Sequence, residues 1–207
     1  MRSSRLASAL ALATLASFLL PGCGNHTLTL NVDVYSFLDP TDVETSIEPH
    51  VPPTPAPGVW LSEDTFPPLV NDKTIQLASG VDQFASVRSV TFHIAVEATD
   101  TTGTGADTLR VYLSGPNQPP RPGTPVVVVP LSFTPPILPA LASIDTVEVT
   151  LDQSQAEAQL FTGKSIRLSI TNAVRGPVGV PGVDPDLSGR VRLIRLDATV
   201  IAGHESF

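Results

Sequence analysis

The chain has 207 residues, of which 42% are hydrophobic, and its 20 acidic side chains against 12 lysines and arginines give a formal net charge of −8. This charge disfavours binding to nucleic acid or to an anionic membrane surface, and we predict no nucleic-acid partner. A single cysteine excludes a disulfide-stapled domain. The length suits one domain with its own hydrophobic core.

The N-terminal residues have the composition of a secretory signal. Arg2 and Arg5 precede a run of apolar or small residues from 6 to 20. This run is shorter than the roughly 20 residues that span a bilayer and suits the apolar core of a signal peptide. We therefore expect residues 1–22 to be a signal peptide. The run ends at Leu20, three residues before Cys23, the chain's one cysteine.

Leu20-Pro21-Gly22-Cys23 resembles the lipobox of bacterial lipoproteins. Leu20 and Gly22 match the pattern, whereas Pro21 stands where Ala, Ser or Thr is usual. The resemblance implies a diacylglycerol thioether on Cys23, cleavage before it, and acylation, as by palmitate, of the new amino group. Several acyl chains anchor a protein firmly, since each buried CH2 contributes about 0.8 kcal/mol. Gly24, in place of Asp, favours the outer membrane over the inner. The alternative is a soluble secreted protein with Cys23 as a bystander.

The first predicted strand follows the lipidated start, residues 23–26. Apolar and polar residues alternate from residue 27, with the inward positions at Leu28, Leu30, Val32 and Val34. Such alternation is typical of a half-buried strand. Since it begins only about four residues after the anchor, a distance of no more than about 14 Å, we expect the domain to lie close to the bilayer.

A long proline-rich loop is predicted next, over residues 39–72. Loops of this length are usually functional or disordered. Trp60 and Phe66 are apolar residues within it. We expect them to dock the loop onto the domain, and the alternative is a stacking surface for a sugar or a peptide.

Seven further strands are predicted from alternation and apolar runs, at 74–77, 89–98, 108–114, 126–133, 145–151, 165–171 and 190–202. The run at 126–133 predicts burial on both faces, and Pro130 confines it to a sheet edge or a bulge. In the last strand the inward series Val191 and Leu193 continues at Ile194 and Leu196, a phase slip that predicts a β-bulge.

One short helix is predicted near 155–162, with Ser154 and Glu157 as a capping box and Gly163 after its end. Eight strands and almost no helix indicate an all-β fold. We predict a single antiparallel β-sandwich over residues 27–207, of the immunoglobulin-like or jelly-roll type.

The connections between strands are predicted to alternate between the two ends of the sandwich. One end then collects the segments 36–73, 98–107, 134–144 and 173–189, which hold most of the excess negative charge. Since the first strand starts beside the lipid, this end points away from the membrane. We interpret it as an acidic, membrane-distal surface for partners or divalent cations. The alternative is that the acidic loops only keep the domain soluble.

Catalytic motifs are not evident. A nucleophile elbow is missing, and the histidines are scattered. His93 and Glu97 share the polar face of one strand, which we interpret as a solvated face. Calcium, which binds loop oxygens, is the best metal candidate. The residues that could bind it are Asp100, Asp107, Asp184 and Asp186.

These observations favour a non-enzymatic lipoprotein of the bacterial cell envelope, anchored to the membrane through Cys23, that binds or braces an envelope protein or glycan through its distal loops. No cofactor is predicted, with Ca²⁺ as the only candidate. The alternatives are a calcium- or carbohydrate-binding module on the same scaffold, and an envelope hydrolase.

Overall fold

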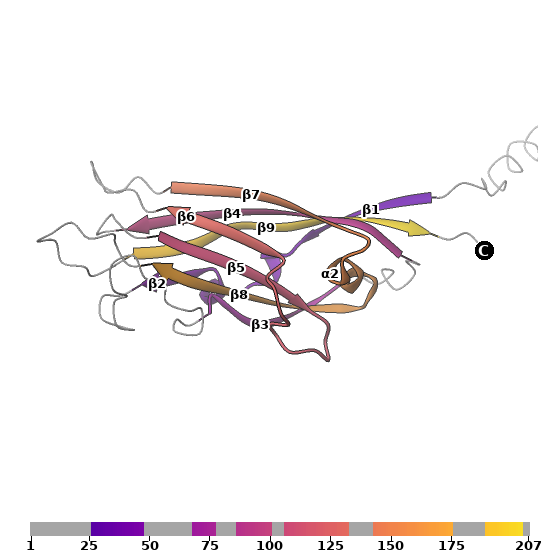
Figure 1. The fold of residues 1–207 in the computed structure, drawn as a ribbon, viewed down its shortest axis with the longest axis horizontal. Helices are drawn as coiled ribbons and strands as arrows, with labels where there is room; N and C mark the ends of the chain where they lie inside the picture. Colours follow the sequence, from indigo (N-terminus) through magenta and orange to yellow (C-terminus); the bar gives the residue numbers. More distant parts are fainter. Residues whose placement is uncertain are drawn as a thin grey trace, which may run out of the picture.

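The computed structural model describes residues 26–47, 68–77, 86–100, 106–132, 143–175 and 189–204, which form two antiparallel β-sheets packed as a sandwich (Figure 1). The first sheet contains five strands: β1 (His26–Asp33), β2 (Glu44–Ile47), β4 (Ser86–Asp100), β7 (Ser143–Asp152) and β9 (Gly189–His204). The second contains four: β3 (Val70–Gln76), β5 (Ala106–Ser114), β6 (Val127–Ser132) and β8 (Ser165–Arg175). The predicted antiparallel sandwich is confirmed, with one strand more than the eight predicted.

The strands pair in the nested order of a jelly roll. The first sheet has the order β1-β9-β4-β7, with β2 also paired to β9, and the second has the order β3-β8-β5-β6. With β2 set aside, the eight remaining strands pair from the outside of the sequence inward: β1 with β9, β3 with β8, β4 with β7 and β5 with β6. Of the two sandwich types that the sequence left open, the jelly roll is therefore the one observed.

The core lies between the sheets and consists of alternate side chains from each strand. On β4, the predicted inward residues Val90, Phe92, Ile94 and Val96 are all at most 2% exposed. The same alternation buries only the second half of the first predicted strand: Val32 in β1 and Val34 directly after it are buried, whereas Leu28 is 50% exposed. The first half of β1, which is an edge strand, therefore lies largely outside the core, whereas Val87 and Ala202 beside it are at most 1% exposed.

The short helix is α2 (Ala156–Gln159), which continues as the 3-10 turn η4 (Leu160–Thr162). Phe161 anchors it, since its ring packs 6.0 Å from that of Phe92, centroid to centroid. The predicted capping box is wrong, because the N-cap residue is Gln155 and the Ser154 hydroxyl instead donates a hydrogen bond to the Asp152 carboxylate.

The strand β2 was not predicted. Two 3-10 turns, η1 (Tyr35–Phe37) and η2 (Pro40–Asp42), lead into it, and a reciprocal capping box between Asp39 and Asp42 closes the second turn. The Leu193 N–H then donates a 2.8 Å hydrogen bond to the Val43 carbonyl. Part of the predicted 39–72 loop is therefore ordered against β9, while residues 48–67 lie outside the described residues.

Two predictions about individual strands have different outcomes. The bulge in β9 is confirmed: Ala95 pairs with Arg195 but Val96 pairs with Leu193, so Ile194 is the extra residue. Ile194 was predicted to point inward, yet it is 38% exposed because the bulge releases it from the alternation.

The prediction that both faces of β6 are buried is wrong. As an edge strand β6 buries one face, and Val128 on the other face is 45% exposed.

Candidate functional site

The two ends of the sandwich differ, as the alternation of connections predicted. β1 begins and β9 ends together, with His26 paired to His204, at the right of Figure 1. The strand ends that flank the predicted distal segments lie together at the other end. Their pairs are Ile47 with Gly189, Asp100 with Gly189, Ala106 with Arg175, Ala106 with Ser132, and Ala98 with Ser143. The chain therefore enters the sandwich at the end opposite to these connections.

Several of the acidic side chains predicted to form the distal surface are neutralised within the fold. Asp39 and Asp42 both form an ion pair with Lys73, and hydrogen bonding to Asp39 raises the pKa of the Lys73 ammonium. Asp72, in a left-handed conformation with φ 56° at the β3 bulge, binds the Arg167 guanidinium through both carboxylate oxygens. The described part of this surface is therefore less acidic than its composition suggests.

Asp107 is the one predicted calcium ligand whose side chain the structure describes. It faces the core of the sandwich on β5 and is only 1% exposed. Its Oδ1 accepts a 2.6 Å hydrogen bond from the Thr108 N–H, whereas Oδ2 has no hydrogen-bond partner among the described residues. Burial raises the pKa of the Asp107 carboxyl to about 7, and the Thr108 bond offsets a smaller part of this rise. A carboxyl buried in this way is costly to ionise without a counter-charge.

A second buried side-chain oxygen of this kind belongs to Asn172 on β8, the strand beside β5. Its side chain is 2% exposed, and within the described ranges its Oδ1 also has no hydrogen-bond partner. Asn172 pairs with Leu109, two residues along β5 from Asp107, so the two polar side chains occupy diagonal positions on one sheet face. Two unsatisfied oxygens among core residues are unusual, because almost all buried polar atoms have a partner.

The other predicted site residues are not brought into this arrangement by the described residues. Asp100 ends β4, and only its backbone pairing with Gly189 is described. Cys23, Trp60, Phe66, Asp184 and Asp186 lie outside the described residues. Within the described part of the chain, no group of three or more His, Cys, Asp or Glu side chains could hold a metal ion.

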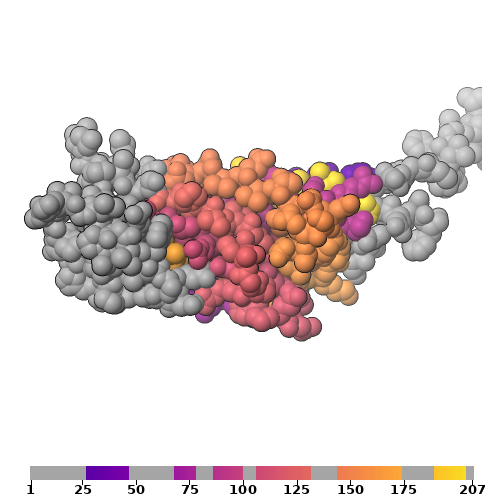
Figure 2. All heavy atoms as spheres, in the orientation of Figure 1, coloured from indigo at the N-terminus to yellow at the C-terminus, as the bar shows by residue number. Residues whose placement is uncertain are grey.

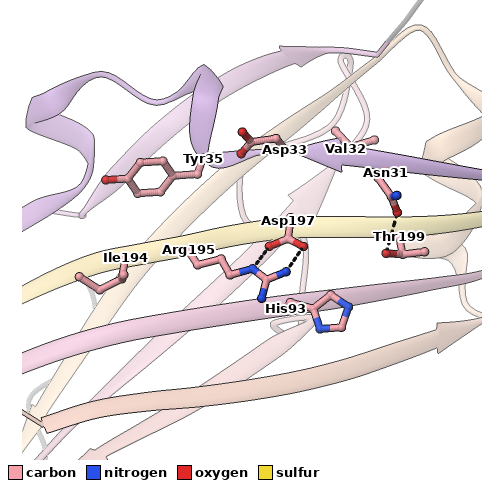
Figure 3. A pocket seen from close by; sticks show the side chains of 9 residues that line it. All are labelled: Asn31, Val32, Asp33, Tyr35, His93, Ile194, Arg195, Asp197 and Thr199. Carbon is pink, nitrogen blue, oxygen red and sulfur yellow. Dashed lines mark hydrogen bonds and ion pairs between the residues drawn. The ribbon is translucent and has the colours of Figure 1, made fainter.

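A polar depression of about 590 Å³ lies on the outer face of the five-stranded sheet (Figure 3). Strand pairing places four ionisable side chains in a row from β1 through β9 and β4 to β7, of which the first three line the depression and the last, on β7, does not. They are Asp33, Asp197, His93 and Glu148. Each lies at an outward position of its strand, because successive residues alternate between the two faces.

Hydrogen bonds hold several side chains that line the depression in place. The Arg195 guanidinium binds both oxygens of Asp197, and this bonding raises the pKa of the Arg195 guanidinium. The Thr199 hydroxyl donates a 3.0 Å bond to the Asn31 amide oxygen (Figure 3). At the far side of the row, His93 Nδ1 lies 3.3 Å from Glu148 Oε2.

The depression has the chemistry of a site for a small polar ligand. Tyr35 and Ile194 supply apolar surface, and the charged and amide groups supply donors and acceptors. His93, which the sequence placed on a solvated polar strand face, is 31% exposed and lies beside the Glu148 carboxylate. The sequence analysis missed Asn31, Tyr35, Arg195 and Asp197 as a group. The alternation indicates that Asn31 and Asp197 face outward, but only the strand register shows that they are neighbours.

No helix in the described ranges is long and apolar enough to cross a membrane. Figure 2 shows the side of the molecule on which segments 106–132 and 143–175 form most of the described surface.

Comparison with known proteins supplies no family for this chain. No protein-family model and no curated protein matches it. Among solved structures, the Gt strain of infectious bursal disease virus matches with 10% identity and a TM-score of 0.39, over 87% of this chain and 38% of that one. The VP2 subviral particle of the same virus matches with 13% identity and a TM-score of 0.36, over the same shares. This chain thus spans well under half of those chains, and likenesses this weak carry no functional argument.

Proposed function

We propose that the protein is a non-enzymatic lipoprotein of the bacterial cell envelope that is anchored through Cys23 and presents binding surfaces away from the membrane. The polarity of the sandwich is the main support. The chain enters β1 at His26, three residues after Cys23, and the strand ends that flank the distal connections lie at the opposite end. An anchor at Cys23 would therefore hold the sandwich upright and direct those connections outward.

Membrane fractionation tests the anchor. We expect the full chain to remain in the membrane pellet through high-salt and alkaline washes, because acyl chains do not depend on charge for binding. Cys23→Ser should appear in the soluble fraction. Gly24→Asp is the matched control: it keeps the lipid and, by the lipoprotein pattern, should shift the protein from the outer to the inner membrane. Retention of Cys23→Ser in the washed pellet would contradict the proposal.

Calcium binding is a second candidate function, favoured by Asp107 and Asn172. Their orphaned oxygens are the ligand type that Ca²⁺ prefers, and a cation would supply the counter-charge that the buried Asp107 carboxylate lacks. Backbone carbonyls and water would have to complete the coordination.

Thermal melting in CaCl2 tests this candidate. With the full chain in a mild detergent at pH 8, Ca²⁺ should raise Tm relative to EDTA, and Mg²⁺ should do so less. Asp107→Asn and Asn172→Ala should each abolish the rise, whereas Asp152→Asn, an exposed aspartate, should retain it. Equal Ca²⁺ effects on all four proteins would exclude a site at Asp107.

A further inference from the structure

The edge strands of the sandwich differ in how they are protected against pairing with another chain. On β6, Pro130 removes a backbone donor, and on β3 the register shifts between Val70 and Lys73. β1 lacks proline and a bulge, but it is shorter than β7, with eight residues, and the chain turns into η1 after Asp33. β7 likewise has no proline and no bulge in its pairing with β4, and it runs for ten residues. Among the described residues it is hydrogen-bonded to β4 alone, so its other edge is free.

The inward side chains of β7 are incompletely covered. Val147 and Val149 pack against the core but remain partly exposed, while their pairing partners on β4, Ile94 and Phe92, are at most 2% exposed. On the outward face of β7, Ile144 near the start of the strand is 60% exposed. A strand added at this edge would bury apolar surface in addition to forming backbone hydrogen bonds.

The charge of β7 indicates what kind of strand would fit. β7 carries Asp145, Glu148 and Asp152 and no lysine or arginine. A second copy of β7 would bring like charges together, which is destabilising across a strand pair. A strand with lysine or arginine would place opposite charges there, and such pairs speed association and fix register.

We propose that the free edge of β7 is a docking site for an extended, cationic segment of a partner protein, which adds to the five-stranded sheet as a further strand. This inference goes beyond the proposed function and does not depend on the lipid anchor. Backbone hydrogen bonding supplies the affinity, and the acidic side chains select the partner by charge.

A designed peptide tests the proposal. The probe is a capped decapeptide that alternates lysine with valine, titrated by calorimetry into the full chain in a mild detergent at low salt. Two matched peptides serve as controls: one has glutamate in place of lysine, and one has N-methylated valines, which cannot donate backbone hydrogen bonds. We expect each control to bind at least tenfold more weakly. Equal binding of the N-methylated peptide would overturn the proposal, because only non-specific charge attraction would remain.

Variants of the two neighbouring edges locate the site. Thr146→Lys, at an exposed position of β7, should weaken binding at least tenfold, whereas Val128→Lys on β6 should leave it unchanged. Hydrogen exchange of the wild-type chain gives a readout that needs no variant: the peptide should slow exchange of β7 amides. Three results would each refute the β7 site. They are slower exchange of β1 or β3 amides in place of β7 amides, no peptide binding, and dimerisation of the chain without peptide in sedimentation.

Discussion

Asp107→Asn should stabilise the protein at alkaline pH. In the folded chain, burial raises the pKa of the Asp107 carboxyl to about 7, from an unfolded value near 3.9. Between these values the unfolded state has released the proton that the folded state retains, so the free energy of unfolding falls as pH rises from about 4 to 7. Below this window both states are protonated, and above it both are ionised. Asparagine removes this loss because it stays neutral.

The size of the effect follows from the shift. A difference of about 3 pKa units corresponds to about 4 kcal/mol, at 1.36 kcal/mol per unit, as an upper bound. The amide of asparagine retains an oxygen for the Thr108 N–H, and its NH2 group adds a donor on the sheet face that also carries Asn172. The advantage of Asp107→Asn should therefore grow from near zero at pH 4 to several kcal/mol at pH 8.

Urea unfolding of the full chain in mild detergent and EDTA, at intervals from pH 4 to 8, measures this difference. Asp152→Asn is the control of opposite sign. Hydrogen bonds from Ser154 lower the pKa of the Asp152 carboxyl, so its stabilisation is present at neutral pH and lost as pH falls through its folded pKa. Parallel stability curves for wild type and Asp107→Asn would refute the burial argument.

Three further outcomes are expected in the same unfolding assay. Phe92→Ala should cost about 3–5 kcal/mol, because it removes a fully buried ring packed on Phe161. Deleting Ile194 should abolish cooperative unfolding, because loss of the bulge would turn the inward-facing residues before it toward solvent. The substitution Ile194→Thr keeps the bulge and should change the free energy of unfolding by less than about 1 kcal/mol. Arg167→Gln should lower the urea midpoint, because it leaves Asp72 without its bidentate partner, and an unchanged midpoint would show that this pair does not stabilise the fold.

Local patterns in the sequence predicted much of the fold, since alternation determines which side chains face the core. The bulge at Ile194 was predictable because it breaks a long alternation within one strand. The strand β2 was not, because four residues in a proline-rich context carry too little periodicity. Pairing order is non-local, and the sequence alone could not distinguish the jelly roll from the immunoglobulin-like sandwich.

The candidate sites were less accessible to sequence reasoning. The inward series Leu109, Val111 and Leu113 already implies that Asp107 faces the core, but a loop boundary placed near it obscured this signal. The depression depends on register: Asp197 contacts residues of β1 and β4 that are distant in the sequence. Such neighbours become visible only when the strands are aligned.

Mass spectrometry of the mature N-terminus tests the central claim most directly. The account predicts that the processed chain begins at Cys23, with a diacylglyceryl group on sulfur and an acyl group on the new amine. An unmodified Cys23, or a mature chain that starts at a different residue, would contradict the anchor and with it the proposed orientation of the sandwich.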